Sequence, residues 1–289
     1  MEPLFEHVTE VDGRRTRVLE LEGHGPPLLL LHGYGDSADT WRPVLAELGM
    51  RDRRAVAVDL PGYGKASKLG PGAVLPQLDA FAAELVERIA AEAGEPVVVV
   101  GNSLGGALAL RLGERADLPI AGIVPIAPAG LEMPRWFDLI EHDPVLRRVL
   151  ALPLPIPNQV LKTTVSAVYK RLVFHHPDRI EAGVVNTFCS HHHGRAGVAA
   201  LLAAGRRLLP ELGPGAFDLE RVAVPMLLVW GARDRMIPPS GARVILGALP
   251  DTTVELIDDC GHCPQLEAAE RTVELLLGFA RTRAPATAA

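Results

Sequence analysis

The sequence has little cysteine and no long apolar run. Its 289 residues include three cysteines, Cys189, Cys260 and Cys263, which are too few and too unevenly spaced for a disulfide framework and fit a reducing compartment. No apolar run approaches the roughly 18 residues that a membrane-spanning helix needs, and the first residues lack the basic and apolar regions of a secretion signal. These absences predict a cytoplasmic protein without stable membrane insertion.

Basic tracts are also missing. The formal net charge is -6 at pH 7, whereas binding to nucleic acid or to an anionic membrane needs clustered lysine and arginine to contact phosphates. The sequence therefore argues against nucleic acid as a partner and favours a small-molecule substrate. It gives no indication of the oligomeric state.

Short apolar runs alternate with helical patterns along much of the chain. Runs rich in valine, leucine and isoleucine, typical of strands buried on both faces, occur at residues 28–31, 55–58, 97–100, 120–126 and 226–230. Helical spacing follows at residues 78–93 and 107–115. This alternation predicts an α/β fold with a mostly parallel central sheet and helices on both faces.

The ends of this pattern are recognisable too. Residues 5–11 and 16–21 flank the turn dipeptide Asp12-Gly13, which predicts a hairpin at the sheet edge. Residues 253–257 form the last strand-like run, and residues 268–281 have the pattern of a closing helix.

The alternation stops between residues 131 and 221, where prolines interrupt helical fragments and no strand-like run occurs. We therefore expect a core domain formed by residues 1–130 and 222–283, with a helical cap of residues 131–221 inserted into it. Residues 284–289 are expected to form a disordered tail.

Gly101-Asn102-Ser103-Leu104-Gly105 directly follows a buried run and precedes a helical pattern. That context is the strand, turn and helix of a G-x-S-x-G nucleophile elbow. The sharp turn strains the serine backbone, and its flanking glycines let strand and helix approach closely. Ser103 is therefore the candidate nucleophile.

A serine hydroxyl needs an imidazole to accept its proton. His262 is the best placed histidine, because it follows the last predicted strand in a glycine-containing loop, where open α/β sheets carry their chemistry. Asp234 follows the strand-like run that ends at residue 230 and gives the chain order serine, aspartate, histidine. Asp258 and Asp259 are the alternative acids, although they lie very close to His262 along the chain.

The developing oxyanion of acyl transfer needs two backbone amide donors. One normally belongs to the residue after the nucleophile, here Leu104, and the other to a loop after an earlier strand. The segment His32-Gly33-Tyr34-Gly35 is such a loop and makes Tyr34 the second candidate.

With these motifs in place, the sequence resembles the α/β-hydrolase superfamily. The similarity lies in His32-Gly33, in the segments 59–64, 101–106 and 231–234, and in Gly261-His262. The resemblance implies an α/β-hydrolase fold with a Ser103, Asp234 and His262 triad. No motif in the cap indicates a particular subfamily.

The resemblance leaves three functions open. The first is hydrolysis of a carboxylic ester of a small or medium apolar substrate through an acyl-serine intermediate. The second is carbon-carbon bond hydrolysis, because residues 101–106 and 261–267 are similar to segments of the meta-cleavage product hydrolases; Cys263 departs from that pattern, which usually has tryptophan there. The third is a hydrolase-like ligand receptor with little turnover.

No cofactor or metal is expected for any of these functions. Cys260 and Cys263 have the spacing of a thiol redox pair, but they lie late in a hydrolase-like chain, and whether they have a redox role stays open. Three successive histidines, residues 191–193, point in different directions in a helix or loop and rarely bind one ion. His175 and His176 are interpreted either as packing and surface residues or as residues that line an apolar acyl pocket.

Overall fold

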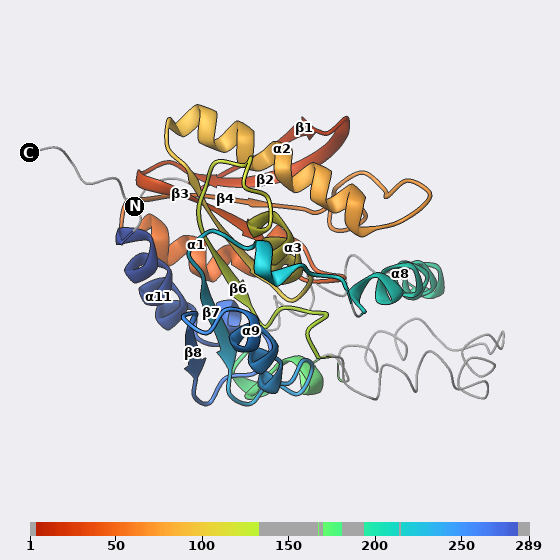
Figure 1. Cartoon of the computed structure of the whole chain (residues 1–289). Coiled ribbons are helices and arrows are strands. Elements are labelled where there is room, and N and C mark those ends of the chain that lie inside the picture. The colour runs from red at the N-terminus through yellow and green to blue at the C-terminus, as the bar shows by residue number, and fades with distance from the viewer. Residues whose placement is uncertain (1–3, 133–166, 168–169, 181–193, 214, 283–289) are drawn as a thin grey trace, which may run out of the picture.

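The computed structural model describes residues 4–132, 167, 170–180, 194–213 and 215–282. It contains an eight-stranded sheet with the strand order β1-β2-β4-β3-β5-β6-β7-β8 (Figure 1). The strands are β1 (Phe5–Val11), β2 (Arg14–Leu21), β3 (His24–Leu31), β4 (Arg53–Val58), β5 (Val97–Asn102), β6 (Ile120–Ile126), β7 (Leu227–Gly231) and β8 (Thr253–Ile257).

The sheet is antiparallel only at one edge. β1 pairs with β2 and β2 with β4 in antiparallel register, whereas the pairs from β4 through β3, β5, β6 and β7 to β8 are parallel. This arrangement confirms the predicted edge hairpin and the mostly parallel sheet. The carboxyl ends of the parallel strands meet at one edge, so the loops after β3, β5, β7 and β8 come together there.

Helices cover both faces of the sheet (Figure 1). One face packs against α2 (Leu75–Ala93), α3 (Leu104–Gly113) and α9 (Ala242–Ala248), and the other against α1 (Arg42–Gly49) and α11 (Ala269–Arg281). Alternate residues divide between the two cores: Leu29 and Leu31 belong to the first, Leu28 and Leu30 to the second. A strand buried on both faces needs such a continuous apolar run, which is why the run was visible in the sequence.

The remaining long helix is α8 (Gly194–Leu208). The shorter elements are η1 (Ala38–Trp41), η2 (Pro177–Arg179), η3 (Leu209–Leu212), η4 (Leu219–Arg221), η5 (Pro239–Gly241) and α10 (Pro264–Glu267). Most of the expected cap, residues 131–221, lies outside the described residues, as does the expected tail at 284–289. Among the cap residues that are described, α8, η2, η3 and η4 are helical and none is a strand. In the described part of the chain, no helix is long and apolar enough to cross a membrane.

The described end of α8 and the residues after it attach to the core near α2. Arg207 donates to the carbonyl oxygens of Gly70 and Gly72, at 2.7 Å each. The Glu211 carboxylate accepts hydrogen bonds of 2.7 Å from the amides of Val74 and Leu75 at the start of α2. A carboxylate at this position satisfies amides that have no partner within the helix and lies at the positive end of the helix dipole.

Candidate active site

Ser103 lies between β5 and α3 with a φ of 54° and a ψ of -110°. A positive φ is uncommon for any residue except glycine and places this serine in a strained turn. The neighbouring glycines make the turn possible: a Cβ on Gly101 would lie 2.0 Å from the Gly105 carbonyl oxygen, and one on Gly105 would lie 2.1 Å from that of Leu31. These approaches hold the serine at the carboxyl end of β5.

The helix after the elbow begins earlier than the sequence suggested. α3 starts at Leu104 rather than at residue 107, and both Gly105 and Gly106 lie inside its first turn. Glycine has low helix propensity, which favoured a later start. Close packing of the helix against β3 and β5 overrides that propensity.

Replacing Gly105 by alanine is expected to destabilise the protein by roughly 3 kcal/mol or more, because the new methyl group would collide with backbone atoms that cannot rotate away. The matched control is Gly247→Ala in the exposed end of α9, where a Cβ would meet nothing within 4 Å and helix propensity favours alanine. Urea unfolding of both variants measures the difference. Equal stability of the two variants would contradict the packing argument.

His262 and Asp234 form a buried pair. His262 Nδ1 lies 2.7 Å from Asp234 Oδ2, and the side chains are 6% and 0% exposed. The other carboxylate oxygen, Oδ1, accepts hydrogen bonds from the amides of Met236 (2.8 Å) and Ile237 (2.9 Å), and Trp230 Nε1 donates to Oδ2 at 3.2 Å. These donors fix the carboxylate so that Oδ2 faces the imidazole.

The loops that carry these two residues are in close contact. A Cβ on Gly231 would lie 1.9 Å from the Gly261 carbonyl oxygen. The loop after β7 can therefore approach the loop after β8 only with glycine at that position. This approach brings Asp234 to His262 across 28 residues of sequence.

Asn102 connects the histidine loop to the elbow. Its side-chain Nδ2 donates to the His262 carbonyl oxygen at 2.9 Å, and its Oδ1 accepts a hydrogen bond of 3.1 Å from Gln265 Nε2. Because Asn102 immediately precedes Ser103, these bonds place the backbone of His262 beside the nucleophile elbow. The structure thus brings the three sequence-predicted triad residues to one end of the sheet.

The predicted oxyanion loop lies next to the serine. A Cβ built on Gly33 would be 3.4 Å from Ser103 Cβ. The buried His32 ring shapes this loop: Nε2 accepts from the Leu60 amide at 2.9 Å, so Nδ1 carries the proton and donates to the Gly33 carbonyl oxygen at 2.7 Å. Leu104, the other predicted donor, is the first residue of α3, where the first-turn amides have no acceptor within the helix.

The Tyr34 side chain makes contacts with α8 and with Tyr63. Its hydroxyl donates to the Leu201 carbonyl oxygen of α8, and burial raises the pKa of Tyr34. Its ring makes an edge contact with Tyr63 at a centroid distance of 5.7 Å. This side chain therefore joins the predicted oxyanion loop to α8, which lies in the expected cap.

Asp36, at the end of the same loop, is a buried acid that sequence reasoning missed. Desolvation by burial raises its pKa to about 7, opposed by the hydrogen bond from the Ser37 amide. An unfolded aspartate loses its proton near pH 4, so between about pH 4 and pH 7 the folded state binds more protons than the unfolded one. The contribution of Asp36 to stability therefore falls as the pH rises through that window.

The Asp36→Asn variant is expected to be more stable than the wild type at pH 8, by on the order of a few kcal/mol, and to lose most of that advantage near pH 4. Asparagine keeps an acceptor for the Ser37 amide but carries no charge. Thermal unfolding at the two pH values measures the effect, with the exposed Asp251→Asn as control. A stability difference that does not change with pH would contradict the assignment.

Both cysteines near the site are buried free thiols. Burial raises the pKa of Cys260 and that of Cys263 well above the usual value. Because the thiolate is the reactive species, these environments disfavour the redox pair considered from the sequence. Cys189 lies outside the described residues.

Two other acids, Asp258 and Asp259, were considered from the sequence as partners of His262. Asp258 is exposed, and the Asp259 carboxylate lies against His175 and His176, whereas the acid that contacts the His262 ring is Asp234. The histidines at 191–193 fall outside the described residues. Sequence reasoning also missed the supporting roles of Asn102 and Trp230.

Comparison with known proteins identifies the family. The model of the alpha/beta hydrolase family matches residues 28–275. The dihydrolipoyllysine-residue acetyltransferase component of the acetoin cleaving system of Pseudomonas putida is 30% identical over 288 residues, which cover 94% of this chain and 68% of that protein.

Solved structures agree with this assignment. A membrane phospholipase A, described as a bacterial virulence factor, is 26% identical with a TM-score of 0.78, and the match covers 96% of this chain and 86% of that one. The 2-hydroxy-6-oxo-6-phenylhexa-2,4-dienoate hydrolase of Rhodococcus sp. strain RHA1 has a TM-score of 0.76 at 21% identity, with 97% and 100% covered, and shows the fold alone. The chain belongs to the alpha/beta hydrolase family.

Proposed function

We propose that this protein is a serine hydrolase that cleaves carboxylic esters of small or medium apolar substrates through an acyl-serine intermediate. The observation that carries the proposal is the buried contact of 2.7 Å between His262 Nδ1 and Asp234 Oδ2, on a loop that Asn102 ties to the Ser103 elbow. Activation of a serine hydroxyl requires a buried, oriented imidazole within its reach, and these contacts support such a role for His262.

Each residue has a defined role in the proposed reaction. Ser103 Oγ attacks the ester carbonyl carbon while His262 Nε2 takes its proton, and Asp234 stabilises the imidazolium that forms. The amides of Leu104 and Tyr34 bind the oxyanion. His262 then returns the proton to the leaving alcohol as the carbon-oxygen bond breaks, which leaves an acyl group on Ser103.

Water completes the cycle in a second half-reaction. His262 accepts a proton from the water as the water oxygen attacks the acyl carbon. It then returns that proton to Ser103 Oγ as the bond between Oγ and the acyl carbon breaks, which releases the carboxylic acid and restores the serine hydroxyl. This cycle uses no cofactor and no metal ion. The names of two similar proteins, an acetyltransferase component and a phospholipase, are compatible with acyl chemistry at such a serine.

We assign the choice of substrate to residues outside the proposed triad and oxyanion loop. We place a helical cap at residues 131–221 over the core formed by residues 1–130 and 222–283. The described contact between Tyr34 and α8 supports this division, because it joins cap residues to the oxyanion loop.

The experiment compares wild-type turnover of nitrophenyl esters of increasing acyl length with turnover of a meta-cleavage dienoate. It is paired with fluorophosphonate labelling and peptide mass mapping. The proposal expects sustained ester hydrolysis and a single adduct on Ser103. An adduct on another residue, or the absence of ester turnover, would contradict it.

The same experiment separates the alternatives. A preference for the dienoate would assign carbon-carbon bond hydrolysis instead, the reaction that the sequence similarity of residues 261–267 suggested. One stoichiometric burst followed by a lasting adduct would assign a ligand receptor. Both outcomes would use the same elbow serine, so substrate turnover rather than labelling decides between them.

A further inference from the structure

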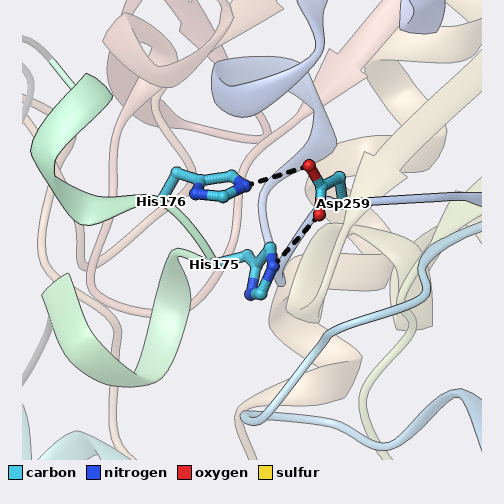
Figure 2. A group of neighbouring side chains, drawn as sticks. All are labelled: His175, His176 and Asp259. Atoms are coloured by element: carbon cyan, nitrogen blue, oxygen red, sulfur yellow. Dashed lines mark ion pairs between the residues drawn. The ribbon is translucent and has the colours of Figure 1, made fainter.

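A second cluster of chemically active side chains lies outside the proposed triad. His175 and His176 face the carboxylate of Asp259 (Figure 2). His175 Nε2 lies 3.3 Å from Asp259 Oδ1, and His176 Nε2 lies 3.2 Å from Asp259 Oδ2. The two histidines come from the described segment 170–180 of the cap, and the aspartate comes from the turn after β8.

The backbones that carry these side chains are held by hydrogen bonds. Glu267 Oε2 accepts from the amides of His175 (2.8 Å) and His176 (3.1 Å), while Glu267 Oε1 accepts from the Gly261 amide at 2.8 Å. The His262 amide donates to the Val173 carbonyl oxygen at 2.7 Å. The backbone of the two histidines and that of the loop just after Asp259 are therefore held in place without any bound ion.

The spacing of the donor atoms suits a small transition-metal ion. One ligand atom from each of His175, His176 and Asp259 can be chosen so that all three lie within 4.8 Å of one another. In a tetrahedral zinc site with bonds of about 2.0–2.1 Å, ligand atoms lie roughly 3.3 Å apart. The two nitrogen-to-oxygen distances, 3.3 Å and 3.2 Å, are close to that value but end on different oxygens of the Asp259 carboxylate, so binding one ion requires the rings or the carboxylate to rotate toward a common centre.

The kinds of donor narrow the choice of ion. Two imidazole nitrogens and one carboxylate oxygen favour Zn²⁺ and its first-row neighbours, whereas Ca²⁺ and Mg²⁺ prefer sites made of oxygen. Asp259 is exposed and the histidines are half-buried, so an ion can reach the site and keep water as a further ligand. Pairing alone would need only one imidazole for one carboxylate.

We propose that His175, His176 and Asp259 form a binding site for Zn²⁺ or a similar first-row transition-metal ion. The ion would join the cap segment 170–180 to the turn that leads to His262. Its role is structural and regulatory: it restrains the cap segment relative to the catalytic loop and takes no part in the acyl transfer.

The test is calorimetric titration of the metal-free full chain with zinc chloride, in the wild type and in the His176→Gln and Asp259→Asn variants. The wild type is expected to bind one ion at this site, and each variant to bind at least tenfold more weakly. The matched control is His24→Gln, because His24 also contacts an aspartate, with 2.7 Å between His24 Nδ1 and Asp52 Oδ2, but without a second histidine in that pair.

Two further measurements keep the test independent of folding and of enzyme activity. Circular dichroism and thermal unfolding without metal should show that every variant folds, with an unfolding midpoint close to that of the wild type, because ion pairs with an exposed aspartate contribute little to stability. Cobalt absorption in the visible range should appear in the wild type and disappear in both site variants.

Clear results would overturn the proposal. These are the absence of zinc binding to the wild type, equal binding by the site variants and the wild type, or binding that is lost only when His191, His192 and His193 are replaced together. Because no substrate is used, failure here leaves the proposed ester hydrolysis untouched.

Discussion

Replacing Ser103 by alanine is expected to lower kcat for ester hydrolysis by about 10⁴-fold or more. Alanine removes the only atom that can form the acyl bond, so His262 would have to activate water directly without covalent catalysis. The substitution keeps the Cβ that Ser103 already has in its strained turn, with a φ of 54°. Its thermal unfolding should therefore stay close to that of the wild type.

The measurement is steady-state hydrolysis of the best nitrophenyl ester, with thermal unfolding recorded on the same samples. Ser67→Ala is the matched control, because Ser67 Oγ accepts a hydrogen bond from the Arg15 amide on the exposed surface and has no place in the proposed reaction. Retention of most of the wild-type turnover in Ser103→Ala would remove the acyl-serine mechanism.

The Asp234→Asn variant is expected to lose activity by about 10⁴-fold, and the hydrogen bonds around this residue explain why. The amides of Met236 and Ile237 both donate to Oδ1, so the asparagine carbonyl oxygen must stay there. Its amide nitrogen is then forced into the place of Oδ2, opposite His262 Nδ1.

That nitrogen can only donate, and a donor opposite Nδ1 requires an imidazole with its proton on Nε2. In this tautomer His262 cannot accept the Ser103 proton. The same nitrogen would also face the N–H of Trp230, which donates to Oδ2 in the wild type. The variant should therefore combine a large fall in kcat with a moderate loss of stability.

Asp258→Asn is the control for this second experiment. Asp258 is exposed and lies closer to His262 along the chain than Asp234 does, so it was an alternative acid on sequence grounds. Its replacement should leave ester turnover unchanged. The acid assignment would be wrong if Asp234→Asn stayed active while Asp258→Asn did not.

Much of the fold could be predicted because buried parallel strands have a plain signature. The valine run of β5 is covered on both faces and needs no polar alternation, and β6 (Ile120–Ile126) matches its predicted range. The start of α3 was wrong because propensity says nothing of how closely Gly105 must approach the Leu31 carbonyl oxygen. Such contacts depend on tertiary packing.

The positions of candidate site residues could be predicted where the residue closely follows the end of a strand. Ser103 and His262 follow β5 and β8, so their positions come from topology and turn chemistry. The roles of Asn102 and Trp230 depend on side-chain hydrogen bonds between loops far apart in the sequence, and a single sequence carries no sign of them. The His175, His176 and Asp259 cluster was missed for the same reason, since Asp259 lies more than 80 residues from the two adjacent histidines.

The three hydrogen bonds accepted by Glu267 have a consequence for how this region opens. One carboxylate accepts from the amides of His175 and His176 in segment 170–180 and from that of Gly261 in the loop that carries His262. Opening either side leaves a charged, partly buried group with unsatisfied capacity, which raises the free energy of opening one side alone. We therefore expect segment 170–180 and the histidine loop to unfold locally as one cooperative unit, within which amide protons exchange together.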